Sequence, residues 1–465
     1  MNARMMFVIA VAFFVAASSG CAARGVHRVS DLRTLATLCA EEANPGDVIE
    51  IRPGTYYLDT PKIEVLRSGT PDKPIIIRGV SKNGKRPVID ASKANVNRGI
   101  FYFEETTHDV ILENLELSNA VGGGRPGKEF PRNAAACYIL GSNITIRDCV
   151  IHHSENGLFS THESDFVLVD GCDIGFNGRA AGVGEPHRTH SFYFNSKHQM
   201  VTRSYIHDST DGENFKSRGG NNIFAYNWVD EELAYSLGVD SGNEENTLWL
   251  GNVAVKRTYE GINQGRLLGA GDGTGVARGT LVALNNTFIT IFPRDLYLFT
   301  EKTSTTNVIL MNNVFAGPGE TFLEKNGKGR ITGAANWIDS RAEAVPGDTL
   351  VIGTAGEASD VLTVTKRGED PGFVDAKGMD FHLKTGSPLI GAGLSGKECI
   401  EAIRIVTQFS RSGKGVMPSK AWLDAVDTVD REGPALEPNA KATGATERKG
   451  SGSTDIGAYG YDGQK

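Results

Sequence analysis

The chain has no excess of basic residues, and this excludes one large class of partners. Its 465 residues include 48 Lys and Arg against 56 Asp and Glu, which gives a formal net charge of −8. A nucleic-acid-binding surface needs a cationic excess, because binding depends on releasing the counterions of the phosphates. We therefore expect no nucleic acid partner. The balance still allows an anionic ligand that meets a local row of cations.

Cysteines and long apolar runs are also scarce. The five cysteines after Cys21 have spacings that match no metal motif. His187 and His190 lack a third fixed ligand, so we do not expect zinc. The run Met6–Ala17 has the length of a signal-peptide core and is too short to be a good spanning helix.

The first 21 residues therefore indicate export. Arg4 precedes the apolar run, and Ser18-Ser19-Gly20-Cys21 after it resembles a bacterial lipoprotein processing site. Cleavage before Cys21 would leave a lipid-anchored N-terminus, which would be the only contact with a membrane. We expect residues 1–21 to form a signal peptide of the lipoprotein type, outside the fold, and the protein to reach the bacterial cell envelope, with ordinary secretion as the alternative.

Glycine is abundant, at 56 residues, and the chain carries an internal repeat. Eight segments share one pattern. A residue that is often small or an amide, which we call the marked residue, is followed two places later by an apolar residue. The marked positions are Leu115, Cys149, Cys172, Ser204, Asn227, Asn252, Asn286 and Asn313, and the apolar ones are Leu117, Ile151, Ile174, Ile206, Val229, Ala254, Phe288 and Phe315. One such unit cannot bury its own apolar face, so units must stack.

This repeat predicts an all-β fold, a single-stranded right-handed parallel β-helix. A β-sandwich or propeller rarely keeps one register over eight units. Cys149 and Cys172 would be neighbours in an internal ladder, as packed thiols more readily than as a disulfide. A solenoid must cover its first edge, and the helical pattern that follows Ser30 predicts an N-terminal capping helix with Ser30 as its N-cap.

Both ends of the chain carry further motifs of this fold. The stretches 45–56 and 68–77 near the start, and 370–373, 380–383, 386–388 and 455–458 near the end, resemble segments of pectate-lyase-like β-helix proteins. The resemblance implies fold rather than substrate. We expect β-helix coils over residues 24–320, and C-terminal coils with long loops over 321–465, of which 410–454 form a long excursion.

Lys216 and Arg218 belong to the stretch Asp211–Arg218, which places two cations and two carboxylates within eight positions. Side chains alternate along a strand, so if Phe215 and Ser217 face the core, the two cations face out together, roughly 7 Å apart. The alignment of coils, good to about one residue, places four side chains near one column: His162, Asn195, Lys216 and Asp240. Insertions before it, at 120–132 and 179–189, would form groove walls.

An extended anionic polysaccharide would suit such a groove. Elimination on a uronate needs a base, a cation that stabilises the resulting anion, and a proton donor for the leaving oxygen. Lys216 fits the base, and Arg218 favours its neutral form because like charges repel. His190 or Tyr193 could donate the proton, and His162, Asn195, Asp240 and Arg257 could bind substrate.

A second resemblance concerns this site alone. Glu213-x-x-Lys216-Ser217, followed by Asn221-Asn222 and Tyr226-Asn227, is similar to a segment of alginate lyase and chondroitinase B-like polysaccharide lyases. It implies Lys216 as the base and a possible Ca²⁺ held by Asn177, Asp211 and Glu213. Those enzymes carry an arginine one coil later, whereas Leu237–Gly242 has none. Arg218, Arg257 or Arg266 would have to replace it.

The sequence therefore predicts an exported polysaccharide lyase that cleaves a uronate-containing glycan by β-elimination. A glycoside hydrolase would need carboxylates around one bond, with Asp208, Asp211 and Asp240 as candidates. A uronate epimerase would use the same proton abstraction. A non-catalytic, lipid-anchored polysaccharide-binding scaffold is the alternative from another class, and the missing arginine favours it. Separately, Lys216 and Arg218 could form only a solvated strand face paired with Glu213 and Asp211.

Overall fold

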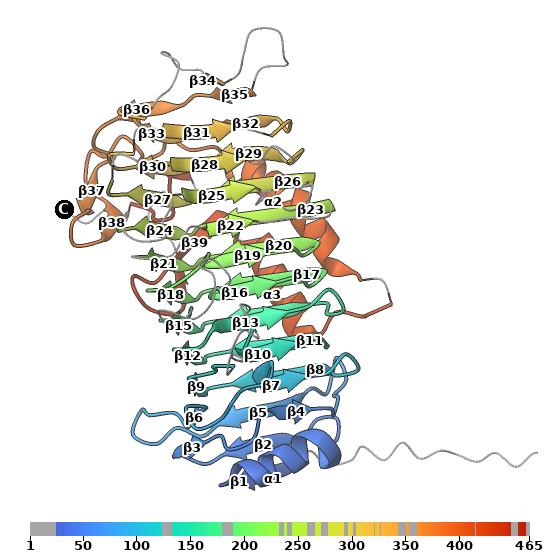
Figure 1. Cartoon of the computed structure of the whole chain (residues 1–465). Helices are drawn as coiled ribbons and strands as arrows, with labels where there is room; N and C mark the ends of the chain where they lie inside the picture. The colour runs from blue at the N-terminus through green and yellow to red at the C-terminus, as the bar shows by residue number, and fades with distance from the viewer. Residues whose placement is uncertain are drawn as a thin grey trace, which may run out of the picture.

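The structure is a computed structural model. It describes residues 25–122, 133–178, 189–231, 237–239, 244–257, 266–270, 278–292, 296–300, 304–319, 321–325, 327–342, 350–352, 360–413, 415–447 and 454–461. Short strands from successive coils stack in register, from β1 at one end to β34–β36 at the other (Figure 1). The chain is a right-handed parallel β-helix, as the repeat predicts.

The first sheet runs the whole length of the solenoid. All its described pairs are parallel except the last, β34 with β35. Its strands are β1 (Val26–Val29), β2 (Val48–Ile51), β5 (Ile75–Gly79), β8 (His108–Glu113), β11 (Ser142–Arg147), β14 (Val167–Asp170), β17 (His198–Thr202), β20 (Asn221–Ala225), β23 (Glu244–Leu250), β26 (Arg278–Leu284), β29 (Asn307–Met311), β32 (Ile331–Ala334), β35 (Asp360–Thr363) and β34 (Leu350–Ile352).

In each coil the chain leaves the first sheet, makes a turn and enters the second sheet. Its strands are β3 (Thr55–Tyr57), β6 (Val88–Asp90), β9 (Glu116–Ser118), β12 (Val150–His152), β15 (Asp173–Gly175), β18 (Tyr205–His207), β21 (Trp228–Glu231), β24 (Val253–Lys256), β27 (Thr287–Thr290), β30 (Val314–Ala316), β33 (Trp337–Asp339) and β36 (Lys366–Gly368).

The third face of the solenoid consists of two sheets and carries the candidate site. One contains β4 (Ile63–Val65), β7 (Gly99–Phe103), β10 (Ala135–Ile139), β13 (Asn156–Ser160), β16 (Phe192–Phe194) and β19 (Phe215–Ser217). The other contains β22 (Leu237–Val239), β25 (Arg266–Ala270), β28 (Leu296–Thr300) and β31 (Thr321–Lys325). Strand β19 lies against β22, so the face continues from one sheet to the next.

The repeat forms the turn between the first and second sheets. The residue before each marked residue has a positive φ, as in Asp148 at 51° and Tyr226 at 57°. In this turn the amide of Asn252 donates to Asn286 Oδ1 at 2.9 Å, and Asn252 Oδ1 accepts from the backbone of Asn227 at 2.9 Å. The ladder continues past Asn313 to one rung that the sequence analysis missed, Asn336.

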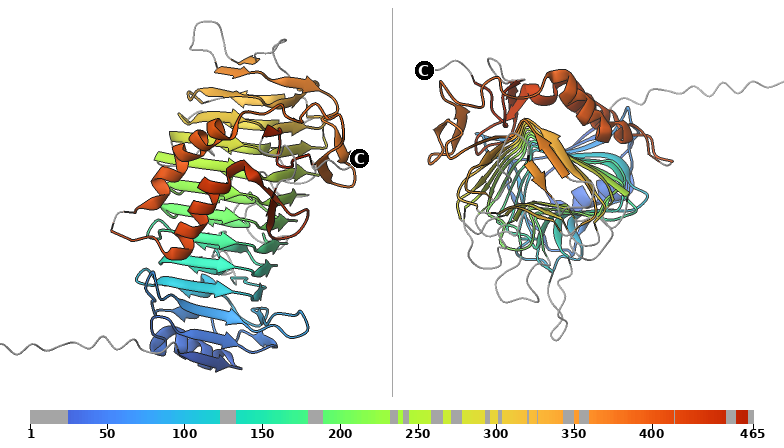
Figure 2. Two further views of the ribbon diagram at one scale, coloured as in Figure 1. Left: turned by 180° about the vertical axis from the view of Figure 1, so that it is seen from behind. Right: turned by 90° about the horizontal axis from the view of Figure 1, so that it is seen from above.

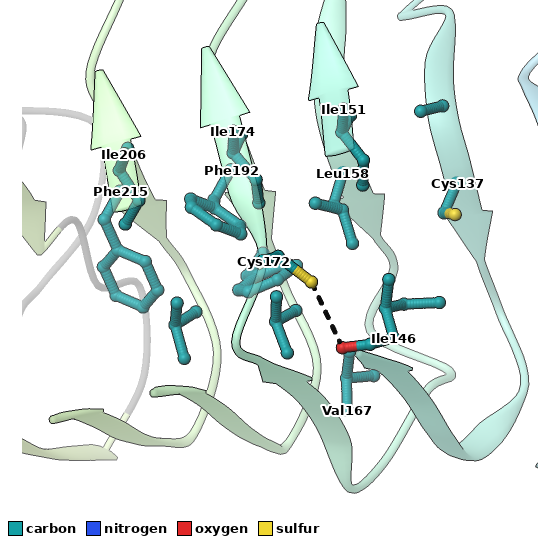
Figure 3. Packing of buried hydrophobic residues seen from close by; sticks show 14 of the residues in the cluster. Cys137, Ile146, Ile151, Leu158, Val167, Cys172, Ile174, Phe192, Ile206 and Phe215 are labelled. Atoms are coloured by element: carbon teal, nitrogen blue, oxygen red, sulfur yellow. Dashed lines mark hydrogen bonds between the residues drawn. The ribbon is translucent and has the colours of Figure 1, made fainter. Parts of the chain in front are cut away.

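The apolar residues of the repeat fill the interior. Figure 3 shows Ile151, Ile174 and Ile206 stacked in successive coils above the rings and chains of the third face. All five described cysteines are buried and none of them forms a disulfide, and Cys172 Sγ lies 3.6 Å from the carbonyl oxygen of Ile146. The two ladder cysteines are therefore packed thiols, as we expected.

The capping helix is present, but its N-cap differs from the prediction. Helix α1 (Leu32–Thr37) continues into a π-helical turn, Leu38–Glu42, over the first coil. The side chain of Asp31, and not of Ser30, accepts a hydrogen bond from the backbone of Thr34 at 2.8 Å. Both residue types serve as N-caps, and the carboxylate at the later position is the one that reaches the free amide.

Two helices near the C-terminus cover the first sheet, and the second of them lies within the stretch 410–454 that we expected to form a long excursion. They are α2 (Gly396–Thr407), followed by the 3₁₀ turn Gln408–Arg411, and α3 (Lys420–Glu432), followed by the 3₁₀ turn Gly433–Ala435. Figure 2 shows both lying along the outer face of the sheet. Their apolar sides pack on outward residues such as Met200, Ile223 and Leu248.

Two short antiparallel pairs lie beside the second sheet and the helices. They are β37 (Phe373–Asp375) with β38 (Asp380–Leu383), and β39 (Leu436–Pro438) with β40 (Ala445–Glu447). Among the helices that the structure describes, none is long and apolar enough to cross a membrane.

Candidate functional site

Lys216 lies in the middle of β19, on the outer side of the third face. Its neighbours Phe215 and Ser217 point inward, because Phe215 joins the main core and the Ser217 hydroxyl donates to Asn222 Oδ1 at 2.6 Å. In the parallel register, Lys216 pairs with Tyr193 of β16. Only 7% of Lys216 is exposed. The alternation that the sequence predicted is therefore present, but the lysine is buried rather than on a solvated surface.

Glu213 lies between Lys216 and His190. Its Oε1 is 3.6 Å from Lys216 Nζ, and its Oε2 is 2.8 Å from His190 Nδ1. Both partners are buried, so their charges interact through a medium of lower dielectric constant than water. Three of the predicted residues thus form one cluster, with a carboxylate between two groups that can exchange protons.

His190 is held from two sides. Its backbone amide donates to Asn156 Oδ1 at 2.9 Å. Before it in the chain, the Thr189 hydroxyl donates to Asp211 Oδ2 at 2.8 Å. Gly212 packs against the ring with φ at +57°, and a Cβ at this position would lie 2.3 Å from His190 Nδ1. Asp211 therefore positions the histidine.

Burial lowers the pKa of His190 below its ordinary value, and the carboxylate of Glu213 opposes this shift. The ring is consequently neutral near pH 7. Its Nδ1 lies 2.9 Å from the backbone N–H of Glu213 and 2.8 Å from the carboxylate of the same residue. If Nδ1 accepts a hydrogen bond from that N–H, the ring proton is on Nε2. If Nδ1 carries the proton and donates it to the carboxylate, Nε2 is an acceptor. The tautomer of His190 therefore decides whether Nε2 donates or accepts a proton.

Arg218 and Tyr193 complete the near side of the cluster. The Arg218 guanidinium carbon is 5.7 Å from the centre of the Tyr193 ring, and that ring is 5.2 Å from the ring of His190. The Arg218 backbone amide donates to the carbonyl of Phe194 at 2.7 Å, which fixes the end of the strand. Lys216, Arg218, His190 and Tyr193, the predicted catalytic group, therefore lie together.

The predicted column of His162, Asn195 and Lys216 differs from the observed register. Tyr193 is the partner of Lys216, and Asn195 lies two positions further along its coil. The turns before these strands differ in length, so counting from the Asn ladder does not transfer to the third face. Asn195 Nδ2 donates to Ser160 O at 2.9 Å, while His162 is exposed and its Nε2 lies 3.0 Å from Glu163 Oε1.

His162 and Asn195 line a groove beside the cluster. It has a volume of about 390 Å³ and runs across β7, β10, β13 and β16, with Tyr193 at the end nearest Lys216. Four outward aromatic side chains form its floor, and the sequence analysis singled out only Tyr193 among them. The signal was present as an aromatic residue in each of four successive coils: Tyr102, Tyr138, Phe159 and Tyr193.

Arg257 lies elsewhere, after β24 of the second sheet. Its Nε is 2.5 Å from Asp230 Oδ1, and its guanidinium is 3.6 Å from Asp208 Oδ1. It is thus engaged in a network away from Lys216. Asp240 and His187 lie outside the described residues, and of Arg266 only the backbone, in β25, is described.

The three residues proposed for calcium do not form a ligand set in the described structure. Asn177 Oδ1 accepts from the backbone of Ser154 at 3.1 Å, Asp211 Oδ2 accepts from Thr189, and Glu213 lies beside Lys216 and His190. Calcium prefers several oxygens directed at one point. No group of three or more His, Cys, Asp or Glu within the described ranges could hold a metal ion. We derive no step through calcium, and calcium dependence stays a prediction.

The comparisons with known proteins concern the fold. The sequence matches no protein-family model and no curated protein. Its structure is similar to pectate lyase Pel9A, at 14% identity over 95% of this chain and 98% of that chain, with a TM-score of 0.51. It is also similar to PfbA, a surface adhesin of Streptococcus pneumoniae, at 12% identity over 76% of this chain and 98% of that chain, with a TM-score of 0.50.

A third solved structure to which this chain is similar is that of an alginate lyase from Paenibacillus sp. str. FPU-7. The identity is 13% over 65% of this chain and 98% of that chain, and the TM-score is 0.45. Identities this low establish a shared fold and nothing about substrate. The chain therefore has the parallel β-helix fold that pectate lyases also have.

Proposed function

We propose that this protein is an exported polysaccharide lyase that cleaves a uronate-containing glycan by β-elimination. The observation that carries the proposal is the buried cluster of Lys216, His190 and Glu213, which lies beside Tyr193 at one end of an aromatic groove. Grouped titratable residues at the end of a groove are typical of active sites. The export part rests on residues 1–21 of the sequence.

Lys216 is the base in this proposal. Its neutral amine removes the proton from the carbon next to the uronate carboxylate, and the electron pair forms a carbon–carbon double bond as the glycosidic oxygen leaves. Burial and the nearby Arg218 favour the neutral amine, whereas Glu213 at 3.6 Å favours the ammonium. Because only the neutral amine can act as the base, the rate of elimination should rise with pH as the lysine loses its proton.

Arg218 and the two ring side chains serve the other steps. The guanidinium can pair with the carboxylate of the substrate, which carries the developing negative charge. Tyr193 or the Nε2–H tautomer of neutral His190 can give a proton to the leaving oxygen. Asp211 and Asn156 act only by holding His190 in place.

A pectate lyase and a surface adhesin both have this fold, so the fold is compatible with cleavage and with a second candidate, binding without cleavage. Leu237–Val239, one coil after Lys216, holds no arginine. Without that cation, the groove could bind a polysaccharide at the cell envelope without cleaving it. The two functions differ in one measurable property, which is turnover.

The test uses the mature chain from residue 22 onward. It is incubated with alginate, pectate, chondroitin, hyaluronan or glucuronan, with and without calcium, and the absorbance of the unsaturated uronate is followed. We expect a rising signal on one polymer that is lost in Lys216→Ala and kept in Lys420→Ala, a lysine exposed on α3. New reducing ends without ultraviolet absorbance would indicate hydrolysis and refute the lyase. Binding without either signal would favour the scaffold.

A further inference from the structure

The four aromatic side chains of the groove form a continuous stack. The ring centres are 5.7 Å apart from Tyr102 to Tyr138, 4.6 Å from Tyr138 to Phe159, and 4.8 Å from Phe159 to Tyr193. The rings of the last two pairs are nearly parallel, with interplanar angles of 8° and 4°. We call this set the aromatic ladder. Its direction follows the solenoid axis, because each ring belongs to the next strand (Figure 1).

The aromatic ladder is separate from the interior of the solenoid. Its buried members, Tyr138 and Phe159, pack with Ala135 in a cluster of their own and not in the main core. They are only 5% and 7% exposed, although they point away from the interior. An apolar strip with hydroxyl groups, at the bottom of a groove, is the kind of surface on which a sugar chain lies.

The spacing of the aromatic ladder also suits a glycan. From Tyr102 to Lys216 the register passes through four strand-to-strand steps, which at normal strand spacing is roughly 19 Å. One strand step is close to the length of one pyranose unit in an extended chain. Burial raises the pKa of Tyr102 and Tyr138, so their hydroxyls stay protonated and can donate to sugar oxygens.

Arg98 gives the groove a positive charge far from Lys216. Its guanidinium donates to the Tyr138 hydroxyl at 2.8 Å and lies 5.2 Å from the centre of that ring. The acidic residues nearby have other partners, since Glu64 pairs with Lys62 at 2.7 Å and Glu163 with His162 at 3.0 Å. Among the described carboxylates, none forms an ion pair with Arg98.

The backbone of Arg98 supports a functional role for this residue. Its φ is +80°, a conformation that side chains with a Cβ rarely adopt. A glycine would avoid that cost, and a residue held in such a conformation points to function when other observations agree. Here the conformation places a guanidinium above the aromatic ladder, where it can bind a carboxylate with two hydrogen bonds.

We infer that the groove is an acidic-glycan subsite, in which Arg98 binds the carboxylate of a uronate several units away from the bond next to Lys216. This inference rests on the proposed function and adds to it the direction of the chain, along the aromatic ladder from Lys216 toward the N-terminal cap. Sugars on that side lie over the ladder, and affinity increases with their number until Arg98 is reached.

The experiment measures binding apart from turnover. The parent is Lys216→Ala, and the probes are size-defined oligo-uronates, from disaccharides to hexasaccharides, of each polymer named above. Neutral cello-oligosaccharides are the control ligands, and calorimetry gives Kd. We expect the affinity for hexa-uronate to fall roughly five- to tenfold in Arg98→Asn. Asparagine tolerates positive φ, so this variant keeps the backbone conformation.

Two controls match this substitution. Arg28→Asn removes an equal charge from the first sheet, where Arg28 pairs with Glu50, and should leave binding unchanged. Tyr102→Ala removes the end ring of the aromatic ladder and should weaken the longer oligosaccharides but not the disaccharide. Added salt should weaken hexa-uronate binding in the parent more than in Arg98→Asn, because screening acts on a charge that the variant lacks.

The outcomes separate the two proposals. Equal affinities of the parent and Arg98→Asn, or equal affinities for short and long oligosaccharides, would overturn the subsite while elimination by the wild-type protein would still support the lyase. Loss of binding in Arg98→Asn together with no elimination by the wild type would support the subsite and overturn the lyase. Absence of binding to every oligo-uronate would overturn the subsite.

Discussion

Gly212 gives a sharp test of the candidate site, because it allows His190 to occupy its position. Its φ is +57°, and a Cβ would lie 2.2 Å from the carbonyl oxygen of Thr189 and 2.3 Å from His190 Nδ1. In Gly212→Ala these atoms must retreat by about 1 Å before the contacts become ordinary ones. The hydrogen bonds from Thr189 to Asp211, at 2.8 and 3.3 Å, would not survive such a shift.

The expected effect on turnover is large. A displacement of about 1 Å at a reacting group can reduce a rate about 100-fold. We therefore expect kcat on the cleaved polymer to fall by about that factor in Gly212→Ala. The pKa of His190, followed by nuclear magnetic resonance, should rise toward its ordinary value as the ring moves out of the buried position that lowers it.

Gly84 provides the matched control. Its φ is +73°, and a Cβ there would meet nothing within 4 Å. Gly84→Ala therefore carries the backbone cost of about 1 kcal/mol without the clash. Both variants are compared by thermal unfolding and by initial rates. The two variants could turn out to have the same rate and the same His190 pKa. In that case His190 would not belong to the reacting group, and the argument from the cluster would fail.

Two further predictions concern stability. Asn252→Ala should lower the free energy of unfolding by about 2–4 kcal/mol in urea titrations. It leaves the buried backbone amide of Asn227 without an acceptor, and the side-chain amide of Asn227 keeps only the carbonyl of Val201. The exposed Asn44→Ala should change the free energy of unfolding by less than about 1 kcal/mol, and equal losses would contradict the role of the ladder. The carboxylate of Glu437, 3.7 Å from His382 Nε2, and after it the hydrogen bond with Asp380 raise the pKa of His382 to about 9. The ionic stabilisation is then complete below the ordinary histidine pKa of about 6.5 and is lost as pH rises through 9. The melting temperature of the wild type should therefore fall across this pH window, whereas that of His382→Gln should not. Parallel curves of melting temperature against pH for the two proteins would refute the pairing.

The sequence determined what repeats locally. The marked residue and the apolar residue two places later recur because every coil must make the same turn and fill the same interior, so the β-helix, the Asn ladder and the packed cysteines followed from spacing alone. The inward position of Phe215 and the outward position of Lys216 followed from strand alternation. The capping box of Ser395 and Glu398 was also present as a signal for helix α2, although we did not use it.

Only the tertiary structure decided which side chains meet. The turns before the third face vary in length, so the pairing of Lys216 with Tyr193 cannot be counted from the Asn ladder. The aromatic ladder needs the same register, and the position of Glu213 between Lys216 and His190 depends on the path of the turn at Gly212. Repetition along the chain is written in the sequence, whereas contact between coils depends on how each turn closes, and that is a property of the folded solenoid.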